Sequence, residues 1–277
     1  MSRGRKSDAR TNAVILKIGG SVLTDKNRES TARPEQIRRI AAEIGAARAS
    51  RLVLVHGAGS FGHHQAKEFG LKEGLNGQSI RGIMPTHNAV RSLSDMIIGE
   101  LYACGVYAAP VHPLSSCTLK NGRIAHICMD VIEQMLASGI VPVLHGDVAM
   151  DTARGIDVLS GDQLVVYLAE ALGAEKAGIG TNVDGVYGGV RTDVSGEGTK
   201  DFKVIHAITP SNLGEVKESL SGSGGVDVTG GMYGKIMELA ELAKAGIPSF
   251  VFNAEKPGNV ARFLRGEPIE GTVISGD

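Results

Sequence analysis

The sequence contains no tryptophan, and aromatic residues make up only 4% of it. Glycine is abundant instead, with 38 residues among the 277. The core must therefore be packed mainly from aliphatic side chains, and the glycines predict many tight turns. Few aromatic residues together with many glycines are typical of layered α/β proteins. The length of the chain is sufficient for one large domain or for two lobes on one sheet.

Cysteine is also scarce, with Cys104, Cys117 and Cys128 as the three members. Their odd number and the lack of a Cys-x-x-Cys pair argue against a disulfide framework and against a zinc site. We therefore expect a protein of the reducing cytoplasm.

Long apolar runs and a charge excess are missing too. No run reaches the roughly 18–20 apolar residues of a membrane span, and the formal net charge is -1, whereas nucleic-acid binders usually have a basic surplus. We expect neither a membrane nor a nucleic acid as partner. The basic cluster at residues 1–6 has no apolar segment behind it, so it does not resemble a signal peptide. Residues 1–12 are expected to form a disordered tail.

Short apolar runs alternate with helical patterns along the remaining chain. The alternation predicts an α/β protein with a mostly parallel sheet covered by helices on both faces. Strands are expected at residues 13–18, 51–55, 106–111, 140–144, 176–180, 249–252 and 272–275. Helices are expected at residues 34–49, 86–103, 129–138, 162–172, 232–245 and 259–264.

Two segments differ from this alternation. Residues 115–127 predict a hairpin with an Asn121-Gly122 turn. Residues 187–203 are rich in Gly, Ser and Asp, which is consistent with a second hairpin or with a loop. A boundary between two lobes would fall within residues 147–161.

Two glycine loops each follow an apolar strand. The first is Lys17-Ile18-Gly19-Gly20-Ser21, and the second runs from His56-Gly57-Ala58-Gly59 to His63. Glycine lets the backbone approach an anion, whose charge is stabilised by exposed N–H groups and by the next helix N-terminus. Two such loops suggest two phosphates brought face to face.

The second loop also fits the G-x-G-x-x-G pattern of dinucleotide-binding folds. That pattern requires an acidic residue about 20 positions further on, at the end of a second strand. Here that distance falls in residues 69–82, which contain four glycines and no apolar strand. An NAD-dependent oxidoreductase is therefore retained only as the alternative from another class.

Three charged residues accompany the loops. Lys17 at a strand end would be costly to bury without an anion, although its ammonium group could also extend to solvent. Asp162 opens a predicted helix, where it could cap the helix, hold nearby lysines, or do both. Lys235 follows a third glycine turn, Gly230-Gly231, at a predicted helix start, which favours an anion site over a surface lysine.

Other candidates carry weaker signals. His63 and His64 are adjacent and lack an Asp, Glu or Cys cluster, so metal ligation is disfavoured, and His63 fits a hydrogen-bond donor to an oxyanion. Taken alone, Lys26 fits a solvated loop charge and Asp184 a turn. The sequence has neither a G-x-S-x-G elbow nor a P-loop.

The motifs occur in one order over residues 14–274 and together resemble the amino acid kinase superfamily, most closely its isopentenyl phosphate kinases. His145-Gly146-Asp147, Ser160-Gly161-Asp162 and the His63 position favour that group. Ala58 departs from the pattern, since relatives often have glycine there. The likeness implies an open αβα sandwich with a mostly parallel sheet, an acceptor-binding lobe at 13–160 and an ATP-binding lobe at 161–277.

The same resemblance implies a cytoplasmic homodimer that phosphorylates isopentenyl phosphate to isopentenyl diphosphate with ATP, which would bring Mg²⁺ with it. A kinase of another small phosphate or phosphonate such as fosfomycin is the alternative. A regulatory ligand-binding domain of the same fold is a third, but the retention of Lys17, Asp162 and Lys235 argues against it.

The resemblance also implies residue roles. Lys17 and Lys235 would stabilise the transferring phosphoryl group, Lys26 would assist at the nucleotide phosphates, Asp162 would organise the lysines, and His63 would bind the acceptor phosphate. Backbone contacts to the acceptor would come from Gly57, Ala58 and Gly161. ATP would be surrounded by Gly19, Gly20, Ser21, Gly59, Asp184, Gly230 and Gly231. An apolar slot for the isoprenoid tail would use some of Met84, Leu93, Met96 and Ile97, for each of which core packing is the alternative.

Overall fold

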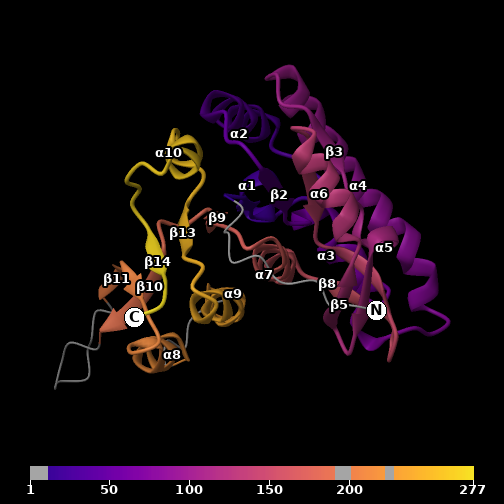
Figure 1. Ribbon diagram of the computed structural model, residues 1–277. Helices are drawn as coiled ribbons and strands as arrows, with labels where there is room; N and C mark the ends of the chain where they lie inside the picture. Colours follow the sequence, from indigo (N-terminus) through magenta and orange to yellow (C-terminus); the bar gives the residue numbers. More distant parts are fainter. Residues whose placement is uncertain (1–11, 191–200, 222–227) are drawn as a thin grey trace, which may run out of the picture.

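The computed structural model describes residues 12–190, 201–221 and 228–277 (Figure 1). The expected disordered tail at 1–12 falls almost entirely outside these residues. The middle of the 187–203 segment, for which a hairpin or a loop was expected, also falls outside them.

An eight-stranded sheet forms the centre of the molecule, in the order β12-β14-β13-β9-β1-β2-β6-β3. All pairs are parallel except β13 with β14, so the sheet is mostly parallel as expected. Its strands are β1 (Val14–Ile18), β2 (Leu52–His56), β3 (Ala108–Pro110), β6 (Val141–His145), β9 (Lys176–Thr181), β12 (Ala207–Ile208), β13 (Ser249–Asn253) and β14 (Thr272–Ile274).

The helices lie on both faces of this sheet, which makes the fold the expected αβα sandwich (Figure 1). They are α1 (Gly20–Leu23), α2 (Pro34–Ala47), α3 (His63–Glu68), α4 (Ser79–Ala103), α5 (Pro113–Ser116), α6 (Met129–Ala137), α7 (Gly161–Leu172), α8 (Leu213–Ser221), α9 (Val228–Lys244) and α10 (Asn259–Arg265). Two 3₁₀ turns, η1 (Gly59–Phe61) and η2 (Leu71–Glu73), flank α3. No helix of the described residues is long and apolar enough to cross a membrane.

The alternation of side chains along β1 divides the core into two layers. Val14, Leu16 and Ile18 pack with α2, α4 and α10 on one face, whereas Ile15 packs with α6, α7 and α9 on the other. Because successive side chains of a strand point to opposite faces, Lys17 shares the face of Ile15. The sequence of β1 therefore directs the Lys17 ammonium group toward α7.

Two smaller sheets lie beside the central one. The 115–127 hairpin is confirmed as β4 (Cys117–Lys120) and β5 (Arg123–Ile127), and Asn121 and Gly122 both have positive φ, as a type I′ turn requires. β7 (Asp147–Asp151) and β8 (Gly155–Leu159), which the sequence did not predict, extend this sheet. β10 (Val186–Val190) and β11 (Asp201–Ile205) pair antiparallel, so the second uncertain segment contains a hairpin.

Two helix predictions were wrong at their N-terminal ends. α4 begins at Ser79 rather than near residue 86, with Pro85 inside the helix. α9 begins at Val228 rather than at residue 232, so Gly230 and Gly231 belong to its first turn instead of to a preceding loop. Lys235 consequently lies two turns into α9. The partial positive charge of the helix N-terminus is therefore not the reason why a lysine stands at this position.

Candidate active site

The two glycine loops are in backbone contact. A Cβ atom on Gly20 would lie 2.3 Å from the Gly59 nitrogen, and one on Gly57 would lie 2.4 Å from the Gly20 nitrogen. Any larger residue at either position would collide with the opposite main chain, so the loops can meet only as glycines. The strand register explains the meeting, because β1 and β2 are parallel neighbours and end together at Ile18 and His56.

Thr24 fixes the two loops to each other. Its hydroxyl donates to the Gly20 carbonyl at 2.8 Å and accepts from the Ser60 N–H at 3.0 Å. Gly59 adopts a positive φ of 53° at this point and faces the Thr24 side chain, which also requires glycine. The methyl group of Ala58 is accommodated by Gly62, whose own Cβ would come within 2.8 Å of it.

A carboxylate lies between two ammonium groups beside these loops. Lys17 Nζ is 2.6 Å from Asp162 Oδ1, and Lys235 Nζ is 2.9 Å from Asp162 Oδ2. Burial lowers the pKa of Lys17 to about 8 in spite of the attraction of Asp162, and the charge of Lys235 adds to that effect. Burial alone would raise the pKa of Asp162, but the two lysines lower it to about 2. The three groups carry a net positive charge at neutral pH, which suits an anionic ligand.

Local structure at the start of α7 places Asp162. Ser160 is the N-cap residue and accepts a hydrogen bond from the Gln163 N–H at 3.2 Å, so capping is not the role of Asp162. Gly161 lies against Lys17, since its Cβ would be 3.1 Å from Lys17 Cε. The α7 N-terminus adds its partial positive charge to the same place.

His63 begins α3 and is exposed, so its ring is accessible to a ligand. Desolvation lowers the pKa of His63, and the charges of Lys72, Lys17 and Lys26 lower it further. These charges place His63 in the field of the lysine cluster. Lys26 is exposed in the loop after α1, as expected for a solvated loop lysine.

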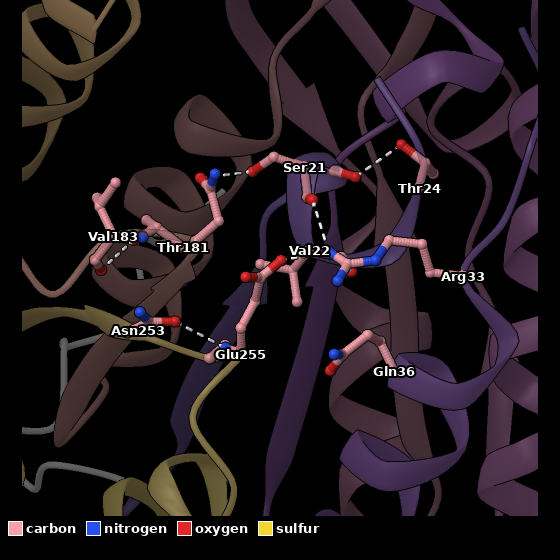
Figure 2. A network of polar contacts seen from close by, with 12 residues as sticks. Ser21, Val22, Thr24, Arg33, Gln36, Thr181, Val183, Asn253 and Glu255 are labelled. Carbon is pink, nitrogen blue, oxygen red and sulfur yellow. Dashed lines mark hydrogen bonds and ion pairs between the residues drawn. The ribbon is translucent and has the colours of Figure 1, made fainter. Parts of the chain in front are cut away.

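The first glycine loop is also tied to the carboxyl end of β13 (Figure 2). Arg33 donates to the carbonyls of Ser21 at 3.4 Å and Val22 at 3.3 Å and forms an ion pair with Glu255. The Ser21 hydroxyl donates to Asn182 Oδ1 at 3.0 Å, on the loop after β9. The start of α2, the loop after β9 and the carboxyl end of β13 thus converge around Ser21.

Asp184 lies on that same loop after β9. It accepts from Asn253 Nδ2 at 2.9 Å and pairs with Lys256 at 2.8 Å. These hydrogen bonds, that of Lys256 first, lower the pKa of Asp184. Asp184 is therefore ionised and held at the edge of the sheet where β9 and β13 end.

The sequence profile of the amino acid kinase family matches residues 12–253. The chain belongs to the amino acid kinase family. The fold and the superfamily expected from the motifs are thereby confirmed.

Within this family, several relatives cover nearly the whole chain. A protein of Methanothermobacter thermautotrophicus named isopentenyl phosphate kinase is 40% identical over 271 residues, covering 95% of this chain and 99% of the relative. A protein of the same name from Haloferax volcanii is 38% identical over 265 residues, with coverages of 95% and 99%. A crystal structure of an isopentenyl phosphate kinase superposes with a TM-score of 0.79 at 36% identity, covering 95% of this chain and 100% of the other.

The structure does not bring the four apolar residues suggested for the tail slot together. Leu93 and Ile97 are 0% and 6% exposed and pack in the core layer that contains α2 and α10, whereas Met84 and Met96 are 53% and 47% exposed. Met84 and Leu93 are nine residues apart in α4, which separates them by about 180° around the helix axis. The core alternative therefore applies to Leu93 and Ile97, whereas Met84 and Met96 are exposed.

Sequence reasoning missed several residues that hold the site. Thr24, Arg33 and Glu255 carry no motif, and their role depends on contacts between distant segments. A third apolar cluster, separate from the two core layers, was also missed. It contains Leu71, Val148 and Ile156, with Ala66, Phe69 and Ile83 packed against it, and so adjoins the helix that His63 begins.

Proposed function

We propose that this chain is an ATP-dependent kinase that converts isopentenyl phosphate to isopentenyl diphosphate. The observation that carries the proposal is the Lys17–Asp162–Lys235 arrangement beside two interlocked glycine loops. Its location in an amino acid kinase fold, and relatives named isopentenyl phosphate kinase, support the choice of acceptor.

In the proposed reaction an oxygen of the acceptor phosphate attacks the γ-phosphorus of ATP. The bond from that phosphorus to the β,γ-bridging oxygen breaks, and ADP leaves with its electron pair. The acceptor oxygen is already anionic, so no general base is required, and the barrier lies in bringing anions together. Lys17 and Lys235 stabilise the charge on the transferring group, and Asp162 holds both ammonium groups in position.

The remaining residues are assigned to two sides of this centre. On the acceptor side, within residues 13–160, His63 donates to the phosphate and Gly57 and Ala58 offer backbone N–H groups, with Gly161 adjoining from the other lobe. On the nucleotide side we place the C-terminal lobe, residues 161–277, with Lys26 contributing at the phosphates. The ATP site is proposed to comprise Gly19, Gly20, Ser21, Gly59, Asp184, Gly230 and Gly231.

The isoprenoid tail requires apolar surface close to His63. Ala66, Phe69 and Ile83 meet this requirement, because they are only partly buried where they pack against Leu71, Val148 and Ile156, and Ala66 belongs to α3, the helix that His63 begins. We assign the tail to this partly buried edge of the cluster.

Magnesium is proposed to enter with ATP. Among the described residues there is no group of three or more His, Cys, Asp or Glu side chains that could hold a metal ion. Magnesium in kinases usually binds through substrate phosphates and waters rather than through a dedicated cluster of side chains. We also propose a cytoplasmic homodimer, on the basis of the family resemblance and of the free thiols of Cys104, Cys117 and Cys128.

The test is ADP release with isopentenyl phosphate, dimethylallyl phosphate, fosfomycin and a panel of amino acids. We expect the highest kcat/KM with isopentenyl phosphate. Turnover of fosfomycin alone would instead assign a phosphonate kinase, and no turnover with either prenyl phosphate would refute the proposal. NADH binding detected by fluorescence would revive the oxidoreductase alternative.

A further inference from the structure

Four histidines and an aspartate are packed together behind the second glycine loop, residues 56–63, which was assigned to the acceptor. His56 ends β2, His145 ends β6, His112 follows β3, and His87 lies in α4. The rings of His56 and His145 are 5.3 Å apart, as are those of His112 and His145. His87 Nδ1 donates to Asp147 Oδ2 at 2.8 Å. The proposed reaction makes no direct use of these rings.

Two of the rings bind the backbone in the same way. His56 Nδ1 is 3.2 Å from the Gly57 carbonyl oxygen, and His145 Nδ1 is 3.1 Å from the Gly146 carbonyl oxygen. A carbonyl only accepts, so Nδ1 must carry the proton in both rings. Burial lowers the pKa of His56 to about 4 and that of His145 to about 3, which keeps both rings neutral. The bare Nε2 of His145 then accepts from His112 Nδ1, 3.0 Å away.

The other nitrogen of His56 explains why the contact at Nδ1 matters. Nε2 is buried and has no hydrogen-bond partner among the described residues. The His56 side chain lines a cavity together with the aliphatic side chains of Ile18, Leu54 and Ile97. An unsatisfied buried acceptor typically costs about 1–3 kcal/mol, so an aliphatic side chain would suit this position better if packing were the only role. What a histidine adds here is the Nδ1–H group.

That group fixes the orientation of a peptide in the acceptor loop. The Gly57 carbonyl and the Ala58 N–H belong to one trans peptide unit and point in opposite directions. Because His56 holds the carbonyl toward the core, the Ala58 N–H points away from the core, and no protein acceptor for it is found among the described residues. His145 holds the neighbouring turn, where the Gly146 N–H donates to the His56 carbonyl at 3.1 Å. Gly146 in turn lies against Gly161, since its Cβ would be 3.4 Å from the Gly161 nitrogen.

We propose that His56 and His145 are positioning residues: His56 orients the Gly57–Ala58 peptide, whose Ala58 N–H receives the acceptor phosphate, and His145 orients the Gly146–Asp147 peptide, against which Gly161 of the acceptor site packs. This inference rests on the proposed function for the identity of the acceptor. It adds that the acceptor site depends on two buried rings that do not touch the substrate.

The test compares His56→Asn with His56→Gln. Asparagine carries its amide nitrogen on Cγ, as histidine carries Nδ1, whereas glutamine carries its amide nitrogen one atom further out. We expect His56→Asn to keep KM for isopentenyl phosphate within about threefold of wild type and His56→Gln to raise it at least tenfold, with KM for ATP unchanged in both. The same pair at position 145 is expected to behave alike.

His206 provides the matched control. Its Nδ1 faces the Gly271 carbonyl at 3.3 Å, but the residue is exposed and lies between β11 and β12. His206→Gln should leave both KM values unchanged. Equal KM values in the Asn and Gln variants at position 56, or equal losses of acceptor and ATP affinity, would overturn the inference and leave the proposed function standing.

A second measurement does not depend on turnover. Nitrogen NMR of ¹⁵N-histidine-labelled wild-type protein at pH 7 should show His56 and His145 as neutral rings protonated at Nδ1, and inorganic phosphate should bind His56→Gln at least tenfold more weakly than His56→Asn. Rings protonated at Nε2, or equal phosphate affinities, would contradict the inference. Failure of wild type to use either prenyl phosphate would instead remove the proposed acceptor.

Discussion

Replacing Asp162 by asparagine perturbs the centre of the proposed site with almost no change in shape. The substitution removes the charge between two ammonium groups that lie 2.6 and 2.9 Å from it. The side chains of Lys17, Lys235 and Asp162 are 7%, 15% and 18% exposed, so solvent cannot fully replace the lost carboxylate.

The magnitude follows from the Lys17 ammonium group. Its pKa of about 8 against a usual 10.5 means that the protein already disfavours the charge by about 3 kcal/mol with Asp162 present. Removing one member of a buried ion pair typically costs about 3–5 kcal/mol, and the partial exposure of Asp162 favours the lower end. We expect the free energy of unfolding at pH 7 to fall by about 2–3 kcal/mol. The loss is limited because Lys17 can give up its proton in the variant and so avoid burying an unpaired charge. We also expect kcat to fall by about 10²–10³, the typical cost of misplaced electrostatic groups.

The assay is a pH profile of kcat/KM for ATP together with denaturant unfolding. In wild type kcat/KM should fall above about pH 8, where Lys17 of the free enzyme loses its proton. In Asp162→Asn the same decline should occur at least about one pH unit lower. Glu238→Gln is the control, since it breaks an ion pair with Arg123 that also involves α9. A variant with kcat within threefold of wild type and an unshifted alkaline limb would refute the reasoning.

Three further predictions concern other groups of the site and the core. Lys235→Met should lower kcat by about 10²-fold or more with little change in acceptor KM, because its charge acts mainly as the phosphoryl group transfers; equal changes in steady-state kcat and KM would count against that role. His63→Ala should raise KM for isopentenyl phosphate at least about tenfold while KM for ATP stays constant, and equal effects on both substrates would argue against its assignment. The lowered pKa values of His56 and His145 mean that the unfolded chain binds protons below about pH 6.5 while the native rings stay neutral, so stability should fall as pH decreases from 6.5 to about 4. For His56 alone the loss is about 3 kcal/mol, and thermal unfolding of His56→Asn should show a correspondingly flatter acid decline.

The sheet could be predicted from the sequence because its central strands are buried on both faces and appear as uninterrupted apolar runs. β7 was missed because it begins and ends with aspartates, Asp147 and Asp151, which are 3% exposed each. Asp151 is satisfied there by four backbone N–H groups, including those of Gly122 and Arg154, and no local pattern shows such partners. The start of α4 was misplaced because Pro85 lies inside the helix rather than at its first turn.

The residues of the site could be identified from the sequence where they belong to local motifs. Lys17, Gly20 and Gly57 could be identified because a glycine loop after a strand has a recognisable sequence. The pairing of Asp162 with both lysines was expected, but no local pattern could establish it, since Lys17 and Lys235 are 218 residues apart in the numbering. Thr24 carries no local signal, and His56 and His145 stand in recognisable motifs that do not show their function, because that function depends on which strand ends become neighbours.

The most direct test of the central claim is a phosphorus NMR spectrum of the purified protein mixed with isopentenyl phosphate, ATP and magnesium. The account predicts that the monoester resonance is replaced by two coupled diphosphate resonances, with one ADP formed for each acceptor consumed. ATP consumed to ADP and inorganic phosphate with the monoester resonance unchanged would contradict it.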